Sequence, residues 1–188
     1  MASHPSSAPR ATEPTPRIDS ELSALKDAVS VALEYAKELG TSAAEVAISK
    51  QQGLSVSTRE KEVETVEFNK DGALGITIYR DGRKGSSSTS DLSPGAIRQA
   101  VKAADGIAKY TSEDPFSGLA DPALMAQDIR DLELYHPQDI DAEELAQLAI
   151  RAEEASLSVD SRIRNSDGAS ANAHTAARVY GNSHGFLN

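Results

Sequence analysis

Residues 68–94 have the sequence FNKDGALGITIYRDGRKGSSSTSDLSP, and this stretch decides the fold of the chain. Leu74, Ile76 and Ile78 alternate with small or polar residues, which is the period-two pattern of a strand with one buried face. Asp81-Gly82 is a dipeptide that accepts positive φ at both central positions of a type I′ turn. The stretch therefore predicts a β-hairpin that reverses at Asp81-Gly82.

The second strand of this hairpin is expected over Lys84–Thr89, where a run of serine and threonine is polar on both faces. Such a strand packs weakly, which favours a place near a sheet edge or a cleft. Ser93 can then cap a helix, and Pro94 suits the first helical position, where its missing N–H costs nothing. We expect this helix to run from Ser93 to about Tyr110.

Two more helices are indicated by apolar residues spaced three and four apart. The first covers Asp19–Leu39 and ends at Gly40, and the second covers Asp141–Leu157 and opens on a capping box. Between the helices, proline-containing residues 111–138 predict a long connection, with a possible short helix near Pro122–Gln127.

Five further strands are expected from alternating or β-branched segments. A slip in the alternation between Val63 and Val66 indicates a bulge or an early strand start. The order helix, strands, helix, helix, strands predicts an α+β fold with a largely antiparallel sheet flanked by helices. The five strands are Glu45–Lys50, Leu54–Arg59, Val63–Asn69, Arg162–Ser166 and Thr175–Tyr180.

Composition excludes several classes of protein. The formal net charge of −10 disfavours direct binding to a nucleic acid, because a phosphate backbone repels an acidic surface. The chain has no cysteine, and no apolar run approaches the length that spans a bilayer. Residues 1–18 form a proline-, serine- and alanine-rich segment without a signal-peptide core, which predicts a disordered tail at the start of a cytoplasmic protein.

Catalytic motifs are missing from the sequence. A zinc peptidase helix needs two ligands on one face, as in H-E-x-x-H, but His4, His136, His174 and His184 are each isolated. His174 and His184 could share a metal only if the final strands folded back on each other. We interpret the acidic clusters and the serine run as solvated surfaces, and expect no catalytic, cofactor-binding or metal-binding residue in this chain.

The hairpin segment resembles the N-terminal region of the PmbA/TldE branch of the TldD/PmbA family, also called modulator of DNA gyrase. Further segments are similar to that branch in the same order, so the resemblance covers the chain from about Leu22 to its end. These segments are VAISK (46–50), LSVSTR (54–59), VETVEFN (63–69), YTSEDP (110–115) and GNSHG (181–185).

The resemblance implies that residues 19–188 form a PmbA/TldD-type N-terminal domain, whose end can fall inside the start of the next domain. In the family the polypeptide continues through a large second domain, so the chain is expected to be an N-terminal fragment covering a little under half of it. The family acts as a two-subunit peptidase in the cytoplasm, trimming microcin-type precursors and degrading unfolded peptides or an antitoxin. Zinc is expected in the TldD-type partner, and none of its ligands corresponds to a residue here.

Two other functions remain open at this stage. The chain could be a non-enzymatic module that binds and regulates a toxin–antitoxin or DNA gyrase system, or a non-functional fragment. Expected partners are a TldD-type subunit and a peptide substrate, with no direct nucleic acid and no membrane. Weak interaction candidates, for which turn or surface roles compete, are Asn69, Asp71, Ser86, Ser88, Asn165, Asn182 and His184.

Overall fold

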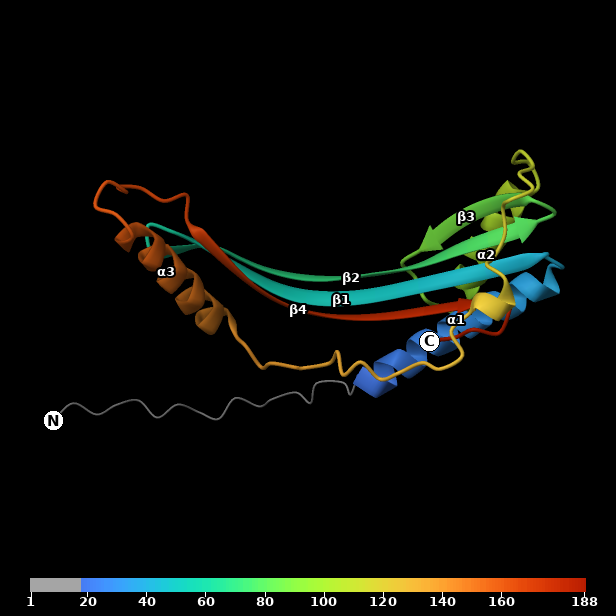
Figure 1. The fold of residues 1–188 in the computed structure, drawn as a ribbon, viewed down its shortest axis with the longest axis horizontal. Coiled ribbons are helices and arrows are strands. Elements are labelled where there is room, and N and C mark those ends of the chain that lie inside the picture. The colour runs from blue at the N-terminus through green and yellow to red at the C-terminus, as the bar shows by residue number, and fades with distance from the viewer. Residues whose placement is uncertain (1–17) are drawn as a thin grey trace.

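The computed structural model describes residues 18–188, which form one four-stranded antiparallel sheet with helices on one face (Figure 1). The strands lie in the order β3-β2-β1-β4. This arrangement confirms the α+β prediction, whereas the expected tail lies outside the described residues except for Ile18, which begins α1. The elements are α1 (Ile18–Glu38), β1 (Ala43–Arg59), β2 (Glu62–Arg80), β3 (Arg83–Thr89), α2 (Pro94–Ala108), the 3₁₀ helix η1 (Pro122–Leu124), α3 (Ala142–Ser158) and β4 (Ala169–Asn182).

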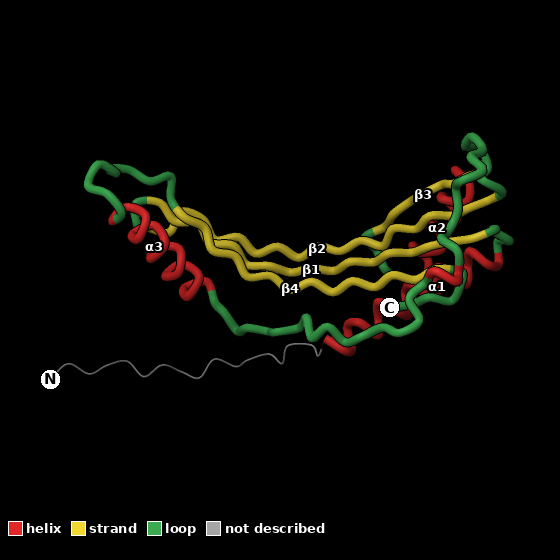
Figure 2. The backbone as a smooth tube through the Cα atoms, in the orientation of Figure 1, coloured by secondary structure: helices red, strands yellow, loops and turns green. Residues whose placement is uncertain are grey.

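β1 and β2 are long continuous strands that bend along the whole molecule (Figure 2). The sequence predicted four shorter strands, with breaks near Gly53 and Gly72, and this was wrong. The turn-prone residues of the two expected breaks pair with each other, because Gln51 lies opposite Asp71 and Gly53 opposite Asn69. The residues of each expected break therefore pair with those of the other break, so both strands continue without interruption.

The β2–β3 turn, strand β3 and the start of α2 are formed where the sequence predicted them. Asp81 and Gly82 have φ values of 50° and 75°, as the predicted type I′ turn requires. Lys84–Thr89 falls within β3, which is an edge strand as expected. Ser93 caps α2 by accepting a hydrogen bond from the amide of Ala96, and Pro94 is the first residue of that helix.

The predicted bulge is present near the other end of the β1–β2 pair. Ser57 pairs with Thr65 but Thr58 pairs with Val63, so Glu64 is the extra residue. The bulge lets Val63 and Val66, three residues apart, lie on the same side of the sheet.

The main core lies between the sheet and the helix pair α1 and α2. We call the side of the sheet that carries Val46 and Ile76 the helix face, and the opposite side the open face. Gly85 allows β3 to approach α2 closely, because a Cβ there would lie 2.2 Å from the carbonyl oxygen of Ala104. Buried residues of this core include Leu25, Val29, Ala32, Val46, Ile48, Leu74, Ile76, Ile78, Ile97, Val101 and Val179.

A second, smaller core lies under α3 at the far end of the same face (Figure 1). Leu145 and Ala149 of α3 pack there on Val56 and Ala171. The predicted capping box at Asp141 is present, with its carboxylate accepting from two backbone amides of the first turn. The two cores leave the middle of the helix face without a covering helix.

Glu153 of α3 fastens the β1–β2 turn to this second core. Its side chain is buried, and its two carboxylate oxygens accept hydrogen bonds from the amides of Glu60 and Lys61, both at 3.0 Å. Those two turn residues have φ values of 54° and 66°, which point their amides toward the helix. The hydrogen bond from Lys61 contributes most to holding the pKa of Glu153 below its usual value.

The C-terminal part contains one long strand where the sequence predicted two. The expected strand over Arg162–Ser166 was wrong, because these residues form a loop that is tied locally by the Asp160 carboxylate. The expected strand over Thr175–Tyr180 is longer than predicted, since β4 pairs with β1 from Ala169 onward. Residues 111–138 form the predicted long connection, with η1 as its short helix.

A charged cluster joins the ends of α1, β2 and α2. The guanidinium of Arg80 donates to the Asp105 carboxylate and to the carbonyl oxygens of Leu39 and Gly40, at 2.7 and 3.1 Å. Lys109 lies 2.7 Å from the same carboxylate. Burial alone would raise the pKa of Asp105, but the hydrogen bonds from Arg80 and Lys109 outweigh it and hold the pKa below its usual value.

Asp105→Asn should lower the free energy of unfolding by about 2 kcal/mol, because Arg80 and Lys109 lose their charged acceptor. The folded-state pKa of Asp105 is depressed, so its contribution is present above its ordinary pKa of 3.8 and is lost as pH falls further. Urea unfolding from pH 7 to pH 3 measures both effects, with exposed Asp139→Asn as the matched control. A difference between Asp105→Asn and wild type that stayed constant below pH 3.8 would contradict this.

Candidate functional site

A groove lies on the uncovered middle of the helix face. It has a volume of about 570 Å³. We call residues 125–140 the strap, because they cross this region between η1 and α3 (Figure 2). The groove lies between the strap and the sheet, and its size is in the range of small-ligand pockets.

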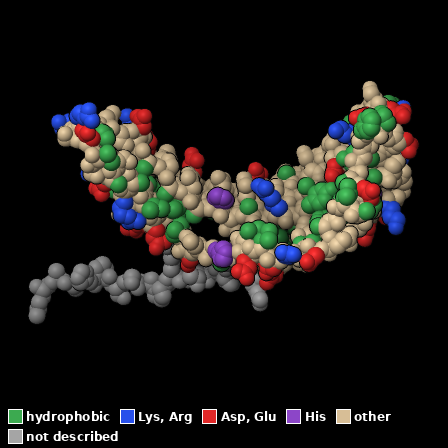
Figure 3. Space-filling view, viewed as in Figure 1, with side chains coloured by type: hydrophobic (Ala, Val, Ile, Leu, Met, Phe, Trp, Pro, Cys, Tyr) green, Lys and Arg blue, Asp and Glu red, His purple; other side chains and the backbone are tan. Residues whose placement is uncertain are grey.

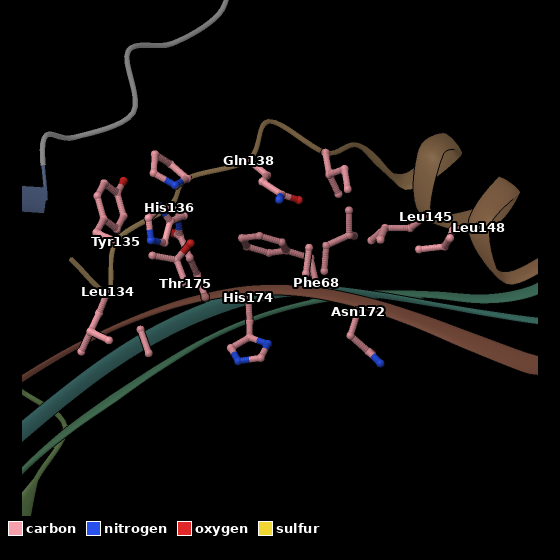
Figure 4. A pocket seen from close by; sticks show the side chains of 17 residues that line it. Phe68, Leu134, Tyr135, His136, Gln138, Leu145, Leu148, Asn172, His174 and Thr175 are labelled. Atoms are coloured by element: carbon pink, nitrogen blue, oxygen red, sulfur yellow. The ribbon is translucent and has the colours of Figure 1, made fainter. Parts of the chain in front are cut away.

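Three sets of side chains line the groove (Figure 4). Phe68 rises from β2 toward the strap, and its side chain is 69 % exposed. His136 and Gln138 of the strap lie across from the sheet, while Leu145 and Leu148 of α3 lie at one end. The lining therefore combines an aromatic ring and aliphatic groups with several hydrogen-bonding groups, which suits an extended peptide better than an ion.

The groove contains no cluster of catalytic groups. His136 lies on the strap, whereas the His174 side chain points from β4 to the open face of the sheet (Figure 4). His184 follows the end of β4 at Asn182, which at about 3.3 Å per strand residue lies about 26 Å along the strand from His174. Within residues 18–188, no three His, Cys, Asp or Glu side chains are placed to hold a metal ion.

Asn69 and Asp71 lie in the middle of β2, so the turn roles proposed for them from the sequence were wrong. Their side chains are on the open face, opposite the one that carries Phe68. Asn69 approaches His174 across Gly53, where an added Cβ would lie 3.0 Å from the Asn69 Oδ1 atom. Asn69, Gly53 and His174 thus lie side by side on three neighbouring strands, β2, β1 and β4.

Ser86 and Ser88 lie on β3, far from the groove. The Ser86 hydroxyl is 3.0 Å from the hydroxyl of Thr77 on the neighbouring strand, which is an ordinary cross-strand contact. The two serines do not contribute to the groove.

Asn182 and His184 lie at the turn after β4, as the sequence suggested, whereas Asn165 lies outside any turn. Asn165 accepts a hydrogen bond from the amide of Ser166 in the loop after α3. Asn182 is buried, and its Oδ1 atom accepts from the amides of His184 and Phe186, so it shapes the turn after β4. The seven candidates are thus spread over separate places and do not form one site.

A second polar group on the open face links three strands. The Glu45 carboxylate accepts hydrogen bonds from the hydroxyls of Tyr79 and Tyr180, at 2.7 and 3.0 Å. Burial, followed by the interactions with Glu45, raises the pKa of Tyr79, and burial likewise raises that of Tyr180. Both phenols stay protonated as donors, so this group stabilises the sheet rather than supplying a base.

The sequence did not reveal Phe68 and His136 as neighbours. The signal that could have found Phe68 is its pairing with Leu54, which places the ring on the helix face beside a residue that packs on the second core. That pairing becomes visible only when β1 and β2 are read as continuous strands.

Comparison with known families identifies the chain. Residues 44–108 match the model described as PmbA/TldA metallopeptidase domain 1, and residues 135–188 match the PmbA/TldA metallopeptidase central domain. The two matches together take in more than half of the chain. The chain belongs to the PmbA/TldD family of metallopeptidases. The boundary between the two domain models falls in the long connection, so α3 and β4 correspond to the central domain.

Curated relatives agree with this assignment. The chain is 58 % identical over 163 residues to a metalloprotease PmbA homolog of Haemophilus influenzae, covering 87 % of the chain and 36 % of the relative. It is 53 % identical over 171 residues to the metalloprotease PmbA of Escherichia coli O157:H7, covering 91 % and 38 %. The chain thus spans little more than a third of these relatives, which is less than the resemblance led us to expect.

Solved structures share the fold. A putative modulator of DNA gyrase from Bacteroides thetaiotaomicron superimposes with a TM-score of 0.71 at 25 % identity, over 87 % of this chain and 37 % of that one. TldE from Thermococcus kodakarensis gives 0.65 at 16 % identity, over 88 % and 36 %. The second likeness supports the fold alone. Among the helices of residues 18–188, none has the length and hydropathy needed to cross a bilayer.

Phe68→Ala should remove the main aromatic surface of the groove while changing the free energy of unfolding by less than about 1 kcal/mol, because the ring is mostly exposed. We expect weaker fluorescence of an apolar dye such as ANS bound to the folded chain. Phe116→Ala is the matched control, since Phe116 is 95 % exposed and is not among the groove residues. Equal dye fluorescence in the two variants would show that the groove does not accept apolar groups.

Proposed function

We propose that this chain is the N-terminal region of the non-zinc, PmbA/TldE-type subunit of a two-subunit metallopeptidase. The observation that carries the proposal is its identity of 53 to 58 % to proteins named metalloprotease PmbA or its homolog. A TldD-type subunit is the proposed partner, and unfolded peptides, microcin-type precursors or an antitoxin are the proposed substrates. A cytoplasmic location belongs to the same proposal, because the resemblance implies it.

Zinc does not fit the described residues of this chain. A zinc site needs three or four His, Cys, Asp or Glu ligands, and no such group is found in residues 18–188. We therefore assign the metal and the bond-breaking chemistry to the TldD-type subunit. This chain contributes a rigid wall that helps to enclose the peptide.

The groove is the part of the wall best suited to a peptide. Its lining offers Phe68 and aliphatic groups to apolar side chains, and His136 and Gln138 to backbone or polar groups. Such a surface holds an extended chain without selecting strongly for one sequence, as broad peptide processing requires.

A regulatory module without peptidase activity is the second candidate. The structural relative from Bacteroides thetaiotaomicron is described as a putative modulator of DNA gyrase, which favours this alternative. The net charge of −10 directs such a role toward a protein of a gyrase or toxin–antitoxin system rather than toward DNA.

Peptide digestion distinguishes the two candidates. A TldD-type subunit is assayed alone, with a complete PmbA-type subunit, and with the same subunit lacking the region that corresponds to this chain. We expect digestion, and co-purification of the two subunits, only with the complete subunit. Unchanged digestion after the deletion would reject the peptidase role, and the regulatory alternative would then stand.

Zinc analysis gives an independent check. The purified 188-residue chain, dialysed against a weak chelator, should retain far less than one zinc per chain when measured by atomic emission. Tight zinc at a stoichiometry near one would contradict the assignment of the metal to the partner.

A further inference from the structure

Part of β2 has a strand on one side only. β2 runs from Glu62 to Arg80, but β3 pairs only with Leu74–Arg80. We call Glu62–Ala73 the free β2 edge, because within residues 18–188 these residues border β1 and no other strand. Unpaired strand edges are templates on which another extended chain can pair.

The register shows which backbone groups face outward. Arg80 and Arg83 flank the two-residue turn, so they form a hydrogen-bonded pair, and every second residue of β2 before Arg80 also points toward β3. The odd-numbered residues point toward β1, in agreement with the hydrogen bond from the amide of Ser42 to the carbonyl of Tyr79. On the free β2 edge, Val66, Phe68 and Lys70 therefore direct their N–H and C=O groups away from β1. Gly72 has the same orientation, but its amide already donates to the Asp71 carboxylate at 2.7 Å.

The side chains beside these groups are exposed on both faces. Val66 and Phe68, on the helix face, are 52 % and 69 % exposed, because α3 packs over β1 and β4 instead. Glu67 and Asp71 lie exposed on the open face. An added strand would therefore meet apolar side chains on one face and carboxylates on the other.

The negative charge of the free β2 edge determines which kind of segment can pair with it. Glu62, Glu64, Glu67 and Asp71 are acidic, whereas Lys70 is the one basic residue of the free β2 edge. A second copy of this edge would bring carboxylates face to face, which is destabilising across strands. A segment with basic residues opposite the carboxylates is attracted instead.

We propose that the free β2 edge binds an extended, basic segment of another polypeptide, which joins the sheet as an additional strand. Backbone hydrogen bonds to Val66, Phe68 and Lys70 hold the segment. Its basic side chains project to the open face near Glu67 and Asp71, and its alternate apolar side chains project to the helix face. The interaction needs neither zinc nor the peptidase assembly, so it is tested on the 188-residue chain alone.

The experiment measures fluorescence anisotropy of a labelled, end-blocked peptide of four Val-Lys repeats. Lys70→Pro removes an outward amide without touching the ladder to β1, and should weaken binding by at least about tenfold. Lys70→Thr is the matched control, because it removes the same charge but keeps the amide, and should bind as well as wild type or better. A peptide of four Val-Glu repeats should bind at least about tenfold more weakly than the Val-Lys peptide.

A charge-reversal variant makes the test independent of the proline. Glu67→Lys combined with Asp71→Lys keeps the amides of Val66, Phe68 and Lys70 and removes only the hydrogen bond from Gly72 to Asp71. It should reverse the preference from the Val-Lys to the Val-Glu peptide. If circular dichroism shows that Lys70→Pro is unfolded, the reversed peptide preference of the double variant is sufficient to test the proposal. Equal binding of both peptides to wild type, or an unchanged preference in the reversed variant, would overturn the proposal. Light scattering that showed a wild-type dimer, lost in the folded Lys70→Pro chain, would assign the edge to a second copy instead.

Discussion

The continuous antiparallel pairing of β1 with β2 is the constraint on which the rest of this structure depends. It runs from Ala43 opposite Tyr79 to Arg59 opposite Glu62, and at about 3.3 Å per residue it spans about 55 Å. Helices of ordinary length cannot cover a ladder this long as one layer. Two separate cores therefore form on the same face, one at each end, and the middle of the sheet stays accessible.

Charged groups fix the helices to the two ends of this ladder. At one end Arg80 and Asp105 join β2 to α2 and to the two carbonyls that directly follow α1. At the other end Glu153 of α3 accepts the two amides of the β1–β2 turn. Each contact satisfies polar groups that the packing of a helix would otherwise bury without partners, so each stabilises one end independently of the other. Figure 3 shows the resulting shape, which is a curved molecule with one lobe at each end.

The accessible middle is where a function can be placed. The groove under the strap and the free β2 edge share Phe68, so both depend on the same gap between the cores. Within residues 18–188, neither contains a group of three side chains placed to hold a metal ion. Family membership supplies the metallopeptidase context, and the geometry supplies the surface on which a polypeptide can lie.

The sequence alone determined the local features of this protein. Asp81-Gly82, Ser93-Pro94 and the Asp141 capping box are each specified by residues next to one another in the chain, and each was predicted at its place. The family was also recognisable from its ordered segments. Tertiary structure decided what depends on pairing over long distances: that Gly53 and Gly72 lie inside strands, that Arg162–Ser166 has no partner strand, and that Phe68 faces the strap. A turn-prone residue forms a turn unless a partner strand satisfies its backbone, and the identity of that partner is not encoded in the neighbouring residues.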